Sequence, residues 1–287
     1  MGKYTLNDLE NLTGIRADTI RIWEIRYGII EPQRTPTNRR WYTDDDLIRL
    51  MNIGLLNNEG IKISKIAKLT SAEINEKVSV TTGGKKKPAD TFVKLITAMN
   101  KLDEEVVDDL INKEIAGLGV ERTFKRILFP FLKKVGILWQ TGAIDPGTEH
   151  FITAILRKHL ISASPGIAGQ GSKKRRKYLL FLPEGEWHEL ALLYFNYVLL
   201  KKGYKTLYLG QSTPLSSVIS AAETWKPDTV ITGTLSGLAV SDASELLLKM
   251  HRELKVKKIL VAGGLAADAE KLKLPDIKPL INERSLI

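Results

Sequence analysis

Apolar residues follow three different patterns along the chain, and these divide it into three regions. Up to about residue 75 they recur every three or four positions, as on the buried face of a helix, except between 31 and 42. The same helical spacing runs through 91–164. From 177 onward, short continuous apolar runs alternate with amphipathic stretches, which is typical of buried parallel strands joined by helices. The pattern predicts a multidomain protein with two helical regions and one α/β region.

The first region carries the local signals of a winged helix-turn-helix. Thr5 and Asp8 can form a capping box at the start of one helix, and a second helix is expected over Ala17–Tyr27. The segment 31–42 has the composition of a two-armed extended loop. Thr43, followed by three aspartates that complement a helix dipole, begins the next helix. A second helix that can enter the major groove and a basic extended wing predict DNA binding.

The middle region predicts four helices of about ten to sixteen residues in a small bundle. The lysine-rich segment before it contains Gly83-Gly84 and has the composition of a linker. The predicted domains are a DNA-binding domain at 1–75, a linker at 76–90, a helical cap at 91–165 and a Rossmann-like domain at 166–287.

The last region predicts a doubly wound parallel sheet. Its four apolar runs are Tyr178–Leu182, Thr206–Leu209, Thr229–Thr232 and Lys258–Ala262, and the helices between them include Trp187–Leu200 and Asp242–Leu254. Ligands of such sheets bind outside the carboxyl ends of the strands. The most distinctive segments of the region all follow strands: Glu186-Trp187-His188, Gly210 to Thr213, Gly233-Thr234-Leu235 and Gly263-Gly264.

Composition excludes several classes of protein. The chain has no cysteine, so disulfides, thiolate catalysis, cysteine zinc sites and iron–sulfur clusters are ruled out. There is no apolar run long enough to span a membrane and no signal-peptide pattern at the start, so a cytoplasmic protein is expected. The formal net charge is +10, but the lysine-rich clusters at 85–87 and 173–177 lie among Gly, Ser and Pro and are interpreted as solvated linker and loop.

Arginines are concentrated where the DNA would lie. Residues 16–42 contain six arginines and three acidic residues. The candidate DNA contacts are Arg16, Thr19 and Arg21 on the second helix and Arg39, Arg40 and Tyr42 on the wing. The series Thr19-Ile20-Arg21-Ile22-Trp23-Glu24, Arg26-Tyr27-Gly28, Pro32-x-Arg34-Thr35 and Arg40-x-Tyr42 resembles the DNA-binding domain of MerR-type regulators, in the branch of the CarH/LitR cobalamin-dependent photoreceptor repressors.

The C-terminal region resembles cobalamin-binding domains of the methionine-synthase type. Their pattern is Asp/Glu-x-His-x-x-Gly, forty-one residues, Ser-x-Leu, some twenty-seven residues and Gly-Gly. This chain has Glu186-x-His188-x-x-Ala191, and the same spacings lead to Gly233-Thr234-Leu235 and to Gly263-Gly264. The resemblance implies that His188 ligates cobalt from below, oriented by Glu186, with the displaced base held beside the sheet. Ala191 replaces a glycine and Gly233 replaces the serine that would bond the base, with Ser236 as a substitute donor.

The middle region resembles the helical cap of the same repressors. Trp139, nine residues and Glu149-His150 match the signature that packs against the adenosyl group of adenosylcobalamin. Some relatives have a histidine directly after the tryptophan, and Gln140 stands there in this chain. The second histidine ligand of a light-induced state is therefore missing at this position.

The favoured interpretation is a DNA-binding repressor, not an enzyme, that responds to cobalamin and forms cofactor-dependent homo-oligomers, dimers or tetramers. One alternative is a regulator of the same architecture that has lost the cofactor and uses its C-terminal half for protein contacts. The other is a cobalamin methyltransferase or mutase, which needs a substrate barrel of about 250 residues that the chain has no room for.

Overall fold

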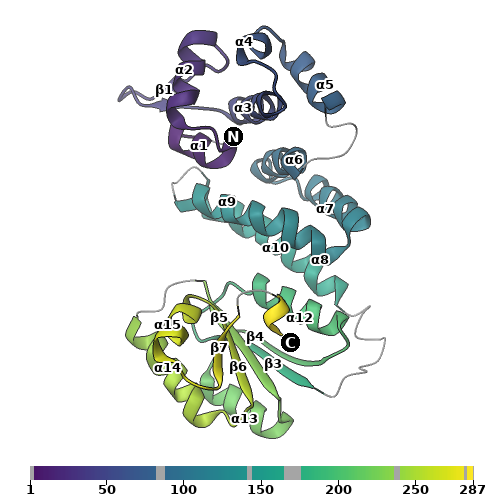
Figure 1. Cartoon of the computed structure of the whole chain (residues 1–287), viewed down its shortest axis with the longest axis vertical. Helices are drawn as coiled ribbons and strands as arrows, with labels where there is room; N and C mark the ends of the chain where they lie inside the picture. Colours follow the sequence, from purple (N-terminus) through teal and green to yellow (C-terminus); the bar gives the residue numbers. More distant parts are fainter. Residues whose placement is uncertain are drawn as a thin grey trace. The chain divides into compact units, whose positions relative to one another are not determined.

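The computed structural model describes residues 3–81, 88–140, 144–164, 176–235, 240–280 and 283–286. It divides into two compact units, Met1–Ile155 and Leu156–Ile287. The first unit holds the first predicted helical region and the second region as far as Ile155, and the second unit holds the sheet (Figure 1). The expected sequence of two helical regions and one α/β region is therefore present.

The first unit begins with the helix-turn-helix. Its elements are α1 (Leu6–Thr13), α2 (Ala17–Tyr27), β1 (Gln33–Arg34), β2 (Arg40–Trp41), α3 (Asp44–Asn58), α4 (Ile63–Ile66) and α5 (Ser71–Thr81). The predicted capping box of Thr5 with Asp8 is formed, and Thr43, the predicted start of α3, forms a second one with Asp46. Gly14 ends α1 with a φ of 76°, which allows the sharp turn into α2. The wing is the antiparallel ribbon β1–β2.

The helical bundle follows, and its last helix continues beyond Ile155 into the second unit. Its helices are α6 (Pro88–Asn100), α7 (Glu104–Leu118), α8 (Val120–Thr123), the π-helical turn η1 (Phe124–Leu128), α9 (Phe129–Gln140) and α10 (Pro146–Ala163). Elements α8, η1 and α9 follow one another without a gap, so this helix exceeds the expected length. Residues 76–81 of the predicted linker belong to α5, and the lysines at 85–87 lie outside the described residues, as do the basic residues at 173–175.

The second unit is a five-stranded parallel sheet in the order β4-β3-β5-β6-β7. The strands are β3 (Lys177–Pro183), β4 (Lys205–Thr213), β5 (Thr229–Thr234), β6 (Lys258–Gly263) and β7 (Ile277–Pro279). The helices are α12 (Leu190–Lys201), α13 (Leu215–Trp225), α14 (Val240–Glu253), α15 (Gly264–Leu272) and the 3-10 turn η2 (Glu283–Leu286). The four predicted strands are present, and β7 is an addition. Helix α12 begins three residues later than expected, which leaves His188 in the loop before it.

Helices cover both faces of this sheet (Figure 1). One face packs against α13, α14 and α15 through a cluster that includes Phe181, Val218, Leu247 and Leu265. The other faces α12 and η2, where the Tyr178 hydroxyl donates to the Leu286 carbonyl at 3.0 Å. In the described part of the chain, no helix combines the length and apolarity needed to cross a bilayer.

Candidate functional site

The strand order places a topological switch point between β3 and β5. After β3 the chain moves outward to β4 on one side, and after β4 it returns to β5 on the other side of β3. In open α/β sheets a crevice forms at such a point, beyond the carboxyl ends of the two strands. The loop after β3 carries Glu186 and His188, and Leu235 directly follows β5. The candidate residues therefore lie where this fold binds ligands.

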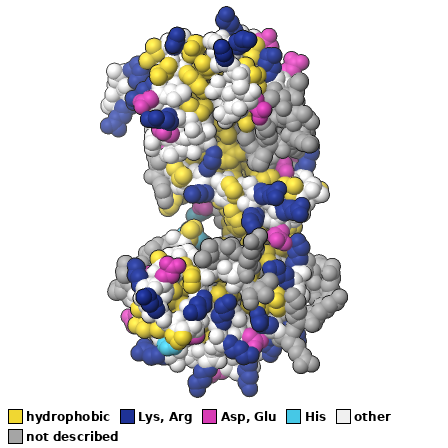
Figure 2. All heavy atoms as spheres, in the orientation of Figure 1, with side chains coloured by type: hydrophobic (Ala, Val, Ile, Leu, Met, Phe, Trp, Pro, Cys, Tyr) yellow, Lys and Arg dark blue, Asp and Glu magenta, His cyan; other side chains and the backbone are white. Residues whose placement is uncertain are grey.

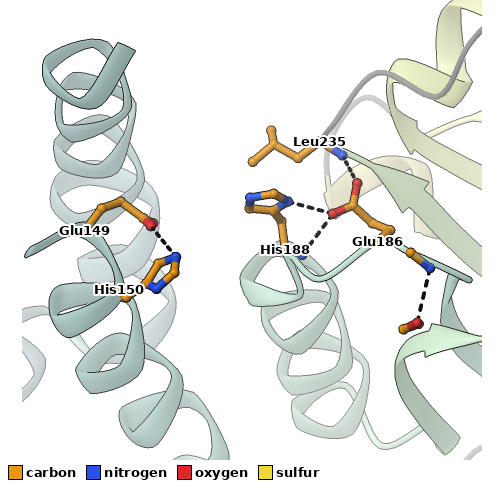
Figure 3. A network of polar contacts seen from close by, with 7 residues as sticks. Glu149, His150, Glu186, His188 and Leu235 are labelled. Atoms are coloured by element: carbon orange, nitrogen blue, oxygen red, sulfur yellow. Dashed lines mark hydrogen bonds and ion pairs between the residues drawn. The ribbon is translucent and has the colours of Figure 1, made fainter. Parts of the chain in front are cut away.

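Glu186 joins the two loops of the switch point. It is 2% exposed. Its Oε1 accepts the main-chain N–H of His188 at 2.9 Å and lies 2.6 Å from Nδ1 of the His188 ring, while Oε2 accepts the N–H of Leu235 at 2.8 Å (Figure 3). The expected hydrogen bond between the acid and the imidazole is thus present.

This contact determines which imidazole nitrogen is available. In the neutral imidazole, a contact of Nδ1 with the carboxylate places the proton on Nδ1 and leaves the lone pair on Nε2. The His188 side chain is 52% exposed, and in Figure 3 one ring nitrogen faces the Glu186 carboxylate while the other lies on the far side of the ring. A half-exposed neutral imidazole with one free nitrogen is a ready ligand for a transition metal.

A second buried acid flanks His188, and no sequence motif indicates its role. Glu189 is 5% exposed and accepts the Tyr208 hydroxyl of β4 at 2.7 Å and Nε of Arg157 of α10. Burial and the Glu189 carboxylate raise the pKa of Tyr208 well above its ordinary value, so the hydroxyl remains a donor. Two buried carboxylates therefore anchor the His188 loop on both sides.

The end of β4 supports the same loop. The predicted strand ends before Gly210, but β4 continues through Thr213 with register shifts against β3, and Gly210 has a φ of 89°. In this irregular segment Ser212 N donates to the Glu186 carbonyl at 3.0 Å, and Gly185 N donates to Ser212 Oγ at 3.1 Å. The two hydrogen bonds of Ser212 thus connect β4 to the His188 loop, and no sequence motif predicts this contact. Thr213 Oγ1 makes two long contacts, to the Gly210 carbonyl at 3.4 Å and to the Gln211 carbonyl at 3.5 Å.

The glycines of the motif serve the packing of β5 against β6. A Cβ on Gly233 would lie 3.0 Å from the Cβ of Ala262, and one on Gly263 would lie 1.9 Å from the Thr234 carbonyl oxygen. A Cβ on Gly264 would approach Thr234 Oγ1 to 2.9 Å. The glycines therefore permit a close approach between β5 and the segment that runs from the end of β6 into α15. The substitute donor Ser236 lies outside the described residues.

The candidate residues of the cap belong to the first unit. Trp139 of α9 is 49% exposed. On α10, Thr153 Oγ1 donates to Glu149 Oε1 at 2.7 Å, and His150 Nε2 lies 3.6 Å from Glu149 Oε2 (Figure 3). The Glu149 side chain is 25% exposed and that of His150 is 79% exposed, so both can meet a ligand. The side chain of Gln140 lies outside the described residues.

Of the predicted DNA contacts on α2 and the wing, all but Tyr42 are at least partly exposed. Arg16, Arg21, Arg39 and Arg40 are exposed and Thr19 is half-buried. Asp18 lies 3.7 Å from Arg21, and both side chains are mostly in solvent, so this pair does not hold the guanidinium. Figure 2 shows Lys and Arg side chains at the end of the unit that carries the wing.

Tyr42 is the exception, and its predicted DNA contact is wrong. Its side chain is fully buried, its main chain pairs with Tyr4, and its hydroxyl donates to Glu24 Oε2 at 2.8 Å. Glu24 Oε1 lies 3.3 Å from Nε of Arg40. Tyr42 is therefore a core residue that positions Arg40 through Glu24 and cannot reach a phosphate.

Comparisons with known proteins agree with this arrangement. The MerR HTH family regulatory protein model matches residues 4–73, which hold the helix-turn-helix. The B12 binding domain model matches residues 92–161, which hold most of the bundle. The monomethylamine corrinoid protein of Methanosarcina barkeri is similar in structure, with a TM-score of 0.57 over 69% of this chain and 96% of that chain, at 17% identity. That likeness is one of fold.

Two repressors of Myxococcus xanthus match nearly the whole chain. The HTH-type transcriptional repressor CarH is 30% identical over 271 residues, covering 92% of this chain and 89% of the relative. The HTH-type transcriptional repressor CarA is 26% identical over 269 residues, covering 91% and 86%. The chain is thus a DNA-binding transcriptional regulator and not an enzyme. It belongs to the family of MerR-type regulators represented by CarH, in which a helix-turn-helix precedes a B12 binding domain.

Proposed function

We propose that this regulator is a repressor that binds cobalamin, with His188 as the lower cobalt ligand, and that its occupancy controls DNA binding. The observation that carries the proposal is the contact of the Glu186 carboxylate with Nδ1 of His188, which leaves Nε2 without a partner among the described residues at the switch point of the sheet. A metal-bound histidine usually donates its other ring N–H to a carboxylate or carbonyl, which fixes the tautomer and the ring orientation.

The residues around His188 fit a corrinoid. Among the described residues, Thr232 Oγ1 is buried without a hydrogen-bond partner, and its position on β5 makes it a candidate partner for the displaced base. Ala191 is exposed on α12, so its methyl group does not fill the protein interior. Gly233 packs against Ala262, where a serine would need a shift of β6, so the base-binding hydroxyl has to come from another residue.

Trp139, Glu149 and His150 are proposed to contact the upper face of the cofactor. The exposed indole can cover an apolar ligand surface, and the carboxylate and imidazole can bond ribose hydroxyls. This donor set favours the adenosyl form. Adenosylcobalamin would supply a light-sensitive Co–C bond, and a homo-oligomer that forms only around the filled site would raise the effective concentration of DNA-binding modules at paired half-sites.

Cobalamin titration of the full chain tests the proposal. Adenosylcobalamin is added in the dark to wild type, His188→Ala and His251→Ala, the last altering another histidine of the same unit. We expect a base-off spectrum in wild type and His251→Ala, and an affinity lower by at least about tenfold in His188→Ala. Equal affinity and spectrum in all three proteins would remove the ligand assignment. Absence of binding in wild type would support the cofactor-free alternative.

A further inference from the structure

We propose that the first unit contains a second ligand site, for a small organic acid with an apolar body and one anionic group. The site is a cavity of about 330 Å³ between the helix-turn-helix and the bundle. It involves none of the candidate cobalamin residues, so the proposal does not depend on cobalamin binding.

The wall of the cavity is mainly apolar. The helix-turn-helix contributes the end of α1, the turn after it and one side of α3, and the bundle contributes α6, η1 and α9. The lining side chains that are apolar include Leu12, Ile15, Met51, Phe92, Ile127 and Phe131. The volume lies at the lower end of the range of about 300–1,000 Å³ that small-molecule sites occupy. An apolar wall of this size suits a compact aliphatic or aromatic ligand.

The charged residues of the wall are all positive. Lys134 and Arg126 line the cavity, and no Asp or Glu does. The Lys134 ammonium donates to the Leu12 carbonyl and lies 4.7 Å from the centre of the Phe92 ring. Neither contact supplies a counter-charge. Burial lowers the pKa of Lys134, as expected for an ammonium that has lost water without gaining a carboxylate.

Arg126 is exposed and makes no hydrogen bond or ion pair with the described residues. A carboxylate that entered the cavity would therefore find a half-buried ammonium and an unpaired guanidinium, both of which form charge-assisted hydrogen bonds. The neutral Asn58 and Thr13 complete the polar part of the lining. A cation would meet two like charges there, which favours an anion as the occupant.

The position of the cavity gives the ligand access to the DNA-binding module. Leu12, Thr13, Gly14 and Ile15 form the turn that joins α1 to α2, and all four line the cavity. An occupant would contact the turn that orients α2, the helix with the predicted base contacts. The site is therefore suited to an effector that acts on the helix-turn-helix directly.

Calorimetric titration with 2-naphthoate tests the site on the full chain, with and without cobalamin. The variants are Lys134→Met and Arg126→Ala, with Lys133→Met and Arg122→Ala as matched controls. Lys133 and Arg122 are exposed basic residues of the same helical segment that do not line the cavity. 2-Naphthalenemethanol serves as the neutral analogue of the probe.

We expect one saturable site for naphthoate, with affinity about tenfold lower in Lys134→Met and Arg126→Ala and unchanged in the two controls. The neutral analogue should bind about tenfold more weakly than the acid. Absence of saturable binding would overturn the proposal, and so would equal affinity in Arg126→Ala and the controls, because an exposed arginine can be removed without unfolding. Equal binding of the alcohol would overturn the assignment to anions.

Discussion

Replacing Glu186 with alanine should loosen the switch-point loops and weaken cofactor binding in one step. The carboxylate accepts two main-chain N–H groups, from His188 at 2.9 Å and Leu235 at 2.8 Å, besides its contact with the imidazole. Each donor that loses its acceptor costs about 1 kcal/mol where water can replace the carboxylate and up to about 3 kcal/mol where it cannot. Leu235 is 75% exposed and His188 half-exposed, so we expect a loss near the lower end, about 2–3 kcal/mol.

Thermal unfolding and hydrogen exchange measure this loss. At roughly 2–4 °C per kcal/mol for a domain of this size, the melting temperature of Glu186→Ala should fall by about 4–12 °C. Amide exchange should accelerate in peptides that cover His188 and Leu235 and stay unchanged in β6. Because the imidazole also loses its partner, affinity for cobalamin should fall about ten- to a hundredfold.

Glu184→Ala is the matched control, since Glu184 is an exposed acid of the same loop. It should change neither the melting temperature nor the cofactor affinity. If Glu186→Ala behaves like this control, the buried carboxylate does not hold the loops together and the orientation of His188 has another cause.

Four further outcomes are expected. The Arg21→Ala, Arg40→Ala double variant should bind operator DNA more weakly, with a salt dependence about one unit shallower per lost phosphate contact and unchanged cobalamin uptake; equal binding would remove the winged-helix assignment. Tyr42→Phe should cost about 1 kcal/mol of stability, seen in urea denaturation, and weaken DNA binding less than Arg40→Ala does. Burial raises the pKa of Tyr4 and Tyr208 above that of an unfolded tyrosine. The stability that their neutral hydroxyls contribute is therefore complete below about pH 10 and is lost as the pH rises further. Phenolate absorbance that rises with pH before the protein unfolds would contradict this. Sedimentation should show a larger oligomer with adenosylcobalamin in the dark than without cofactor or after illumination, and residues 1–75 alone should bind DNA weakly whatever the cofactor or light.

Sequence patterns predicted the elements that local chemistry determines. The capping box at Thr5 depends on residues three positions apart and is formed, and the helix predicted to start after Thr43 begins at Asp44. Four strands were predicted from their continuous apolar runs. The hydrogen bond between Glu186 and His188 could also be expected, because the two residues lie in one short loop. In each case the residues that determine the feature lie within a few positions of one another in the sequence.

The features that the sequence did not reveal depend on contacts between distant residues. Tyr42 follows two arginines, and nothing local shows that it pairs with Tyr4 and lies in the core. Glu189 meets Tyr208 and Arg157, which are 19 and 32 residues away. Strand β7 has only three residues, too few for a hydrophobic pattern. Tertiary packing decides all of these positions.

Contacts within the first unit offer a second route by which a signal can reach the DNA-binding module. The polar composition of 76–90 predicts a linker that cannot transmit a movement. If the linker were the only connection, the cofactor could control DNA binding only through assembly of the oligomer. However, Asn100 at the end of α6 donates to the Tyr4 hydroxyl at 2.8 Å and to Asp44 Oδ1 at 2.6 Å, and Lys134 of α9 donates to the Leu12 carbonyl.

These bonds connect the bundle to the starts of α1 and α3 and to the end of α1, independently of the linker. A displacement of α6 or α9 would have to break them or move the helix-turn-helix with it. The two routes differ in one physical respect: assembly depends on protein concentration, and a contact within one chain does not. A cofactor effect on DNA affinity that persists after dilution below the dissociation constant of the oligomer therefore has to pass through contacts within one chain, such as those of Asn100 and Lys134, and one that disappears on dilution has to pass through assembly.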